Sequence, residues 1–134
     1  METKTKRIIL VYDFVAWRNL LKTLLILTPE WQVIGEATTG AEGLRLVHDL
    51  NPDLVLLDIF LPDINGFDFA RRIQDLVPNI KIVFLTYEPS SEFANAALST
   101  GALGYLLQSD VVNELLPALK TVFAGERFIS KNIY

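Results

Sequence analysis

The stretch that most constrains the fold is residues 54–66, in which an apolar run is followed by an aspartate and then by a loop containing proline and glycine. A continuous apolar run bounded by a turn signal is typical of a strand covered on both faces, as in a parallel sheet. In open parallel sheets, ligands bind at the carboxyl ends of the strands. Asp58, directly after the apolar run, is therefore predicted to lie where chemistry can take place.

The rest of the chain repeats a pattern of strand followed by helix. Apolar runs typical of strands occupy five segments, which are residues 8–11, 31–37, 53–58, 80–86 and 102–107. Apolar residues with helical spacing follow each run, within residues 14–27, 40–50, 67–76, 91–98 and 112–123. Five strand–helix repeats with short connections predict an α/β fold, a doubly wound, flavodoxin-like sheet of five parallel strands with five helices in a single domain.

Two groups of residues on the predicted helices are assigned to the core. In the first helix, Phe14, Trp17 and Leu24 share an apolar stripe, which we interpret as packing rather than as a cofactor site. His48, the only histidine, shares a face of the second helix with Leu44 and is interpreted as a packing residue.

The sequence allows two starting points for the last helix, because the helix contains a proline, Pro117. A helix that begins near Asn113 places Pro117 in its first turn, where proline is tolerated. A helix that begins at Asp110 contains Pro117 in its interior, at a cost of roughly 3 kcal/mol.

Residues 126–134 have no hydrophobic period, unlike the segments before them. We therefore expect residues 1–125 to form the domain. Residues 126–134 are interpreted as the start of a connection to a further domain that is absent from this sequence.

Length and composition narrow the class of protein. A chain of 134 residues is long enough for one domain with a sizeable core. It has no cysteine, which argues against a disulfide framework or a thiolate metal site, and no apolar run long enough to cross a membrane. A net charge of -4 argues against a nucleic-acid-binding surface in this segment. We expect a cytoplasmic protein without membrane contact.

Polar residues end the predicted strands and should converge in space. Tyr12 and Asp13 follow the first strand, Asp58 the third, Thr86 the fourth and Gln108 the fifth. Carboxylates and a backbone carbonyl are oxygen ligands of the kind that hold Mg²⁺ while several waters stay bound. Asp58 could then act as a nucleophile that forms an aspartyl-phosphate, and Thr86 could donate a hydrogen bond to the phosphoryl group.

Several of these residues form a recognisable set. It comprises Leu57-Asp58-Ile59, Pro62 and Gly66 at a characteristic spacing, Leu85-Thr86, and the run Gly101-Ala-Leu-Gly-Tyr-Leu-Leu107. With these motifs the chain resembles, over essentially its whole length, a CheY-like receiver domain of the response regulators of two-component signalling. The pattern Gly104-Tyr-Leu-Leu and residues 124–130 resemble the NarL/FixJ subfamily, whose receivers precede a LuxR-type helix-turn-helix domain.

The resemblance implies a phosphoacceptor rather than an enzyme, with at most slow self-dephosphorylation. Asp58 would accept a phosphoryl group from a sensor histidine kinase, and Thr86 and Tyr105 would switch position in response. Asp13, Asp58 and the backbone carbonyl of Phe60 would bind Mg²⁺. DNA would be contacted only through the absent C-terminal domain, and a homodimer is a further expectation.

Two positions depart from the family pattern. Tyr12 stands where the family usually has an acid, and Gln108 where it usually has a lysine. Loss of a carboxylate that acts on the metal through water typically costs ~10–100-fold in affinity, so we expect weak Mg²⁺ binding. An alternative function is therefore kept open, a pseudo-receiver that acts as a protein-interaction module without phosphorylation.

Overall fold

The structure is a computed structural model that describes residues 5–133. Its strands are β1 (Lys6–Val11), β2 (Trp31–Ala37), β3 (Leu54–Leu57), β4 (Lys81–Thr86), β5 (Gly104–Leu107) and β6 (Phe128–Ile129). Its α-helices are α1 (Val15–Ile26), α2 (Gly40–Leu50), α3 (Gly66–Leu76), α4 (Ser91–Ser99) and α5 (Val111–Phe123). A short 3₁₀ helix, η1 (Gln108–Asp110), precedes α5.

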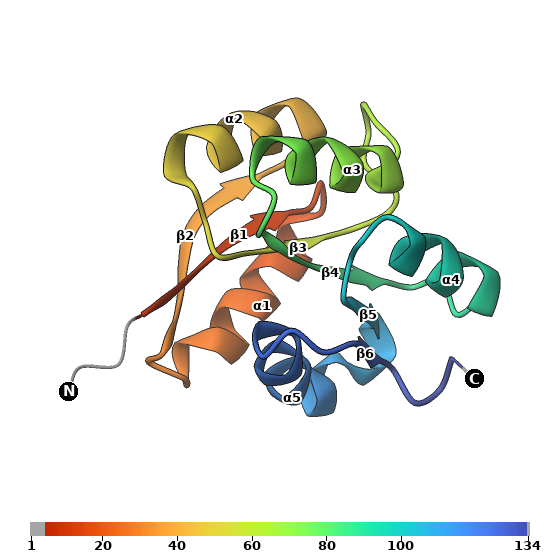
Figure 1. Ribbon diagram of the computed structural model, residues 1–134. Helices are drawn as coiled ribbons and strands as arrows, with labels where there is room; N and C mark the ends of the chain where they lie inside the picture. The colour runs from red at the N-terminus through yellow and green to blue at the C-terminus, as the bar shows by residue number, and fades with distance from the viewer. Residues whose placement is uncertain (1–4, 134) are drawn as a thin grey trace.

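The strands form one parallel sheet in the order β2-β1-β3-β4-β5-β6. Helices α2, α3 and α4 cover one face, and α1 and α5 cover the other (Figure 1). The apolar runs of β1, β3, β4 and β5 are buried because both faces of the sheet are covered. The predicted doubly wound α/β fold with five helices is confirmed.

The predicted number of strands is wrong, because the sheet has six strands and not five. The additional strand β6 pairs in parallel with β5, and the backbone N–H of Phe128 donates to the carbonyl of Leu103 at 2.9 Å. A strand of two residues is too short to show a period, and its pairing depends on backbone groups. The role of residues 126–134 as the start of a connection stays a prediction.

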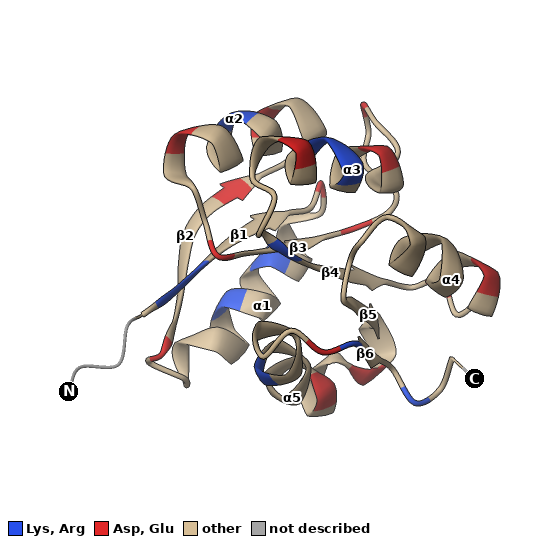
Figure 2. Cartoon of the chain, in the orientation of Figure 1, with Lys and Arg blue, Asp and Glu red and all other residues tan. Residues whose placement is uncertain are grey.

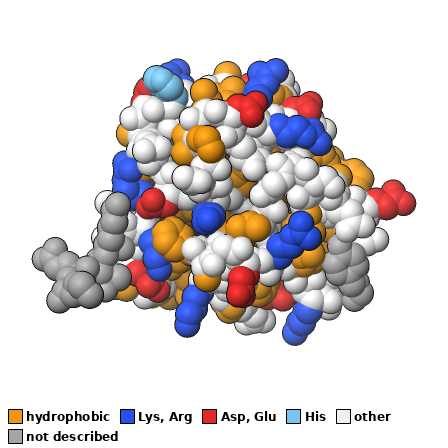
Figure 3. All heavy atoms as spheres, in the orientation of Figure 1, with side chains coloured by type: hydrophobic (Ala, Val, Ile, Leu, Met, Phe, Trp, Pro, Cys, Tyr) orange, Lys and Arg blue, Asp and Glu red, His pale blue; other side chains and the backbone are white. Residues whose placement is uncertain are grey.

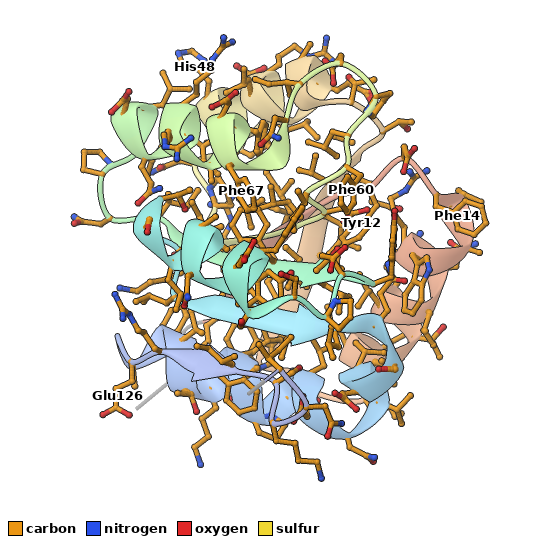
Figure 4. The ribbon with its side chains drawn as sticks, turned by 90° about the vertical axis from the view of Figure 1, so that its right-hand side faces the viewer. Tyr12, Phe14, His48, Phe60, Phe67 and Glu126 are labelled. Carbon is orange, nitrogen blue, oxygen red and sulfur yellow. The ribbon has the colours of Figure 1, made fainter. Side chains whose placement is uncertain are left out.

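Two interpretations of single side chains are wrong. Phe14 is 61% exposed because it precedes the first residue of α1, although Trp17 and Leu24 pack against the core as expected. The side chain of His48 lies on the outer surface of α2 beside Asp49 and is 74% exposed (Figure 4). Phe14 also points outward in this view.

The last helix begins at Val111, directly after η1, so Pro117 lies in its interior. Of the two starting points, the earlier one is confirmed. Proline has no N–H to donate to the carbonyl four residues before it, which here belongs to Asn113. Both residues are exposed, so water can serve that carbonyl.

Charged residues occur on helices of both faces of the sheet (Figure 2). Basic and acidic side chains are interspersed with apolar ones on the face shown in Figure 3. Within residues 5–133, no helix is long and apolar enough to span a membrane.

Candidate functional site

The polar residues at the strand ends converge as the sequence predicts. Tyr12, Asp13, Asp58, Phe60 and Gln108 line one cavity of about 250 Å³. They come from the segments after β1, β3 and β5, which are brought together because parallel strands end at the same edge of the sheet. Figure 4 shows the side chains of Tyr12 and Phe60 close together at this edge.

Asp58 is fixed by hydrogen bonds at the end of β3. Its side chain is buried, and its backbone N–H donates to the carbonyl of Val11. One carboxylate oxygen, Oδ1, accepts the backbone N–H of Ile59 at 2.7 Å. The backbone N–H of Phe60 and the hydroxyl of Thr86 lie close enough to this carboxylate to stabilise its charged form. The carboxylate is therefore held in one orientation at the cavity.

Burial raises the pKa of Asp58, and the nearby charge of Asp13 raises it further. The hydrogen bonds from Ile59, Phe60 and Thr86 oppose this shift by stabilising the charged form. Among the described residues, those that line the cavity include no lysine or arginine. A cation supplied from outside would therefore be attracted to it.

The pH dependence of stability should differ between Asp58 and Asp63. Because the folded pKa of Asp58 is raised, its favourable contribution is present at low pH and is lost as the pH rises through that pKa. The pKa of Asp63 is shifted in the opposite direction, because the backbone N–H groups of Gly40 and Ala41 donate to its carboxylate and lower its pKa. We expect Asp58→Asn to stabilise the protein at pH 7 and Asp63→Asn to destabilise it.

Urea unfolding of both variants between about pH 2 and pH 7 tests this prediction, since the reference pKa of aspartate is about 3.9. The stability difference of Asp58→Asn from the wild type should shrink as the pH falls from 7 toward this reference value, because the folded pKa of Asp58 lies above it. The difference of Asp63→Asn should persist down to the reference value and shrink only below it, because the folded pKa of Asp63 is lowered. The same sign of effect for both variants at pH 7 would contradict the assignment.

Thr86 and Tyr105 hold the loop between β4 and α4 through one residue, Glu88. The backbone N–H of Glu88 donates to the hydroxyl of Thr86 at 3.3 Å. The hydroxyl of Tyr105 donates to the backbone carbonyl of Glu88 at 2.7 Å. Burial and the charges of Glu88 and Asp58 raise the pKa of Tyr105, so the hydroxyl keeps its proton and remains a donor. A change at Thr86 can thus reach Tyr105 through this loop.

Tyr12 occupies the position of the expected acid but is part of the core. Its side chain is 1% exposed and packs in the cluster of α1 and α5. Its hydroxyl donates to the carbonyl of Leu85 at 2.5 Å. Burial is the main reason that its pKa lies well above the ordinary value, and the charge of Asp58 adds to it. Tyr12 therefore does not replace the missing carboxylate chemically.

Three aromatic residues also line the cavity and were not assigned to the site from the sequence, namely Phe14, Trp17 and Tyr87. The ring of Tyr87 stacks on that of Phe60, with centroids 5.3 Å apart. Phe14 and Tyr87 directly follow the polar residues Asp13 and Thr86. Adjacency to the strand ends is the signal that identifies Phe14 and Tyr87, whereas Trp17 lies within α1 and carries no such signal.

Asp13 and Asp58 line the cavity and carry carboxylates, and Phe60, whose backbone carbonyl is the third oxygen ligand expected from the sequence, lines it as well. Such hard ligands fit Mg²⁺, which keeps several waters when only one or two carboxylates bind it. Within residues 5–133 there is no group of three acidic, histidine or cysteine side chains that could hold a metal. The donor set is therefore minimal.

The sequence matches the model of the response regulator receiver domain over residues 8–120. It is 34% identical over 127 residues to response regulator GacA of Pseudomonas viridiflava, covering 95% of this chain and 59% of that protein. It is 35% identical over 124 residues to the nitrate/nitrite response regulator NarL of Escherichia coli K12, covering 92% and 57%. The chain thus spans less than two thirds of these curated relatives.

Solved structures agree with this assignment. A two-component response regulator of the LuxR family from Aurantimonas sp. SI85-9A1 has a TM-score of 0.92 at 33% identity, over 97% of this chain and 93% of that chain. The isolated receiver domain of RcsB from Salmonella enterica, at 18% identity, has the same fold with a TM-score of 0.90. The chain therefore belongs to the receiver domains of response regulators and is related to the LuxR/NarL-type members of that family.

Proposed function

We propose that Asp58 accepts a phosphoryl group from a sensor histidine kinase. The observation that carries this proposal is the fixed orientation of the Asp58 carboxylate, whose Oδ1 accepts the N–H of Ile59 at the edge of an open cavity. One carboxylate oxygen attacks the phosphorus while the bond from phosphorus to the donor nitrogen breaks. Asp58 is then an acyl phosphate. The nitrogen of the donor histidine keeps the electron pair of the broken bond, and the donor leaves as a free imidazole side chain.

Thr86 is the residue placed to detect this change. Its hydroxyl lies within hydrogen-bonding reach of both the Asp58 carboxylate and the N–H of Glu88. A phosphoryl oxygen on Asp58 is a stronger acceptor for the Thr86 hydroxyl than a carboxylate already served by backbone N–H groups. A shift of Thr86 toward it would move the Glu88 loop and with it the hydroxyl of Tyr105.

The carboxylates of Asp13 and Asp58 and the carbonyl of Phe60 would hold Mg²⁺. When bound, the ion neutralises charge on the transferred phosphoryl group. The hydroxyl of Tyr12 donates to the carbonyl of Leu85 and does not replace a carboxylate at the metal. We therefore expect the affinity for Mg²⁺ to be ~10–100-fold below that of a site with the additional acid. Gln108 lines the cavity and offers a neutral amide donor where a lysine would offer a cation.

Phosphorylation of Asp58 is tested by intact mass spectrometry after incubation with Mg²⁺ and acetyl phosphate. We expect the mass of one phosphoryl group to be gained by the wild type and by the control Asp63→Asn, whose carboxylate serves Gly40 and Ala41 instead. Asp58→Asn should gain nothing. If the wild type also gains nothing where an ordinary receiver is fully loaded, the phosphorylation-independent pseudo-receiver replaces this proposal.

The remaining parts of the proposal concern the longer protein. GacA, NarL and the transcriptional regulatory protein DegU of Brevibacillus brevis are all longer than the region matched here, which is 54–59% of their length. We propose that this receiver controls a DNA-binding output domain joined after residues 126–134, in the cytoplasm, and that it forms a homodimer. Its only chemistry of its own would be slow loss of the phosphoryl group.

A further inference from the structure

The C-terminal segment, residues 128–133, is held by hydrogen bonds to β5 and α5 in addition to the pairing of the short strand β6. The backbone N–H of Ser130 donates to the carbonyl of Tyr105 at 2.9 Å. The hydroxyl of Ser130 accepts the N–H of Leu107 at 2.9 Å and donates to the carboxylate of Glu114 at 2.6 Å. Ser130 is 1% exposed and Glu114 is 9% exposed, so this junction lies out of water.

Neighbouring residues reinforce the junction on both sides. The backbone N–H of Lys131 reaches the other oxygen of Glu114 at 3.4 Å. The side-chain amide of Asn132 donates to the carboxylate of Asp110, with distances of 3.0 and 3.1 Å. Ile133 is buried in the same apolar cluster as Tyr105. We call Ser130, Glu114 and their hydrogen bonds the C-terminal latch.

Opening the latch would be unfavourable for specific groups. Leu107 would lose the partner of its buried N–H, and Glu114 would lose the hydroxyl that serves its buried carboxylate. Buried polar groups left without partners are costly, more so when charged. The segment is therefore bound to β5 and α5.

Tyr105 is held from two sides. Its side-chain hydroxyl donates to the carbonyl of Glu88 in the loop after β4, while its backbone carbonyl accepts the N–H of Ser130. One residue thus joins the loop beside Asp58 to the segment by which the chain leaves the sheet (Figure 1). Tyr105 and the C-terminal segment are therefore both attached to strand β5.

We infer that Ser130 is a positioning residue that couples Tyr105 to the C-terminal end of the chain. Release of the Tyr105 hydroxyl from Glu88 loosens β5 and, through Ser130, the C-terminal latch. Loosening of the latch in turn weakens the contact of Tyr105 with Glu88, because coupling between two sites is reciprocal. The link to phosphorylation rests on the proposed function, whereas the link between Tyr105 and Ser130 does not.

Amide hydrogen exchange of the whole chain tests the coupling. We expect Tyr105→Phe to speed exchange at Leu107 and Ser130 by at least about fivefold, beyond any change at core amides of β1. The control Leu27→Ala truncates a side chain that is 78% exposed at the end of α1, away from this loop, and should leave these amides unchanged. If Tyr105→Phe affects only the loop around Glu88, the inference is overturned.

Variants of the latch test the reverse direction. Ser130→Ala should speed exchange at Glu88 as well as at Leu107, and Ser130→Thr, which keeps the hydroxyl, should restore both. Glu114→Gln keeps an acceptor for Ser130 and should give a smaller effect than Ser130→Ala. Faster exchange at Leu107 with no change at Glu88 in Ser130→Ala would show a purely structural residue and contradict the inference.

Addition of Mg²⁺ and beryllofluoride to the wild type separates this inference from the proposed function. Both proposals are supported if amide exchange in the wild type changes at Asp58, Glu88 and Ser130, and if in Ser130→Ala it changes at Asp58 and Glu88 but not in the C-terminal segment. A response at Asp58 and Glu88 without any at Ser130 overturns the inference alone. Absence of any response counts against the proposed function, and the Tyr105→Phe result then decides the coupling by itself.

Discussion

Tyr12→Ala is expected to lower the free energy of unfolding by about 3–5 kcal/mol, as removal of a large buried aromatic side chain usually does. The ring of Tyr12 lies in the apolar cluster of α1 and α5, and the side chain is 1% exposed. The substitution also removes the donor that serves the carbonyl of Leu85. A cavity and an unpaired carbonyl would be left in the same place.

Phe14→Ala is the matched control, because it removes an aromatic ring two residues further along that is 61% exposed. Its expected effect is within about 0.5 kcal/mol. Chemical denaturation of the two variants measures both free energies, and Tyr12→Phe separates the contribution of the hydroxyl from that of the ring. Equal losses for Tyr12→Ala and Phe14→Ala would contradict the different placement of the two rings.

Gly66→Ala is expected to lower the free energy of unfolding by about 1–3 kcal/mol and to disturb the acceptor loop, as overpacking of a tight site does. A Cβ atom at this position would lie 2.5 Å from the backbone carbonyl oxygen of Asp58 and 2.6 Å from Cα of Ile59. Backbone atoms cannot rotate away from the added methyl. The loop that carries the carbonyl of Phe60 must therefore shift.

Gly35→Ala provides the comparison, since its Cβ would meet only the side-chain ends of Leu50 and Leu46 closely, at 3.3 and 3.4 Å. Those ends can move by a few tenths of an ångström. Denaturation and Mg²⁺ titration of both variants should show weaker metal binding only for Gly66→Ala. Metal affinity that is unchanged in Gly66→Ala would argue against the Phe60 carbonyl as a ligand.

The arrangement of the site could be predicted because it depends on topology. Once strands are parallel and joined by helices, residues directly after them must meet at one edge of the sheet. This rule places Asp13, Asp58 and Gln108 together, and in the structure they line one cavity. Thr86 is likewise expected near the acceptor, and its hydroxyl lies close enough to Asp58 to lower the pKa of that carboxyl.

Features that depend on a single backbone contact or on one side-chain direction could not be predicted. Phe14 fits the apolar stripe of α1 by spacing, yet it lies before the helix and turns outward. The strand β6 has two residues, and its pairing depends on carbonyls of Leu103 and Tyr105 that no sequence pattern reveals. Glu114 resembles any solvent-facing helix residue until Ser130 covers it.

Strand β6 has a practical consequence for chimeric proteins that join this receiver to a foreign output module. A junction placed at Gly125 would remove the partner of β5 and leave its backbone N–H and carbonyl groups at an open sheet edge. Open edges pair readily with other chains, so such chimeras would tend to aggregate. A junction after Ile133 keeps the edge covered and the end of the domain intact.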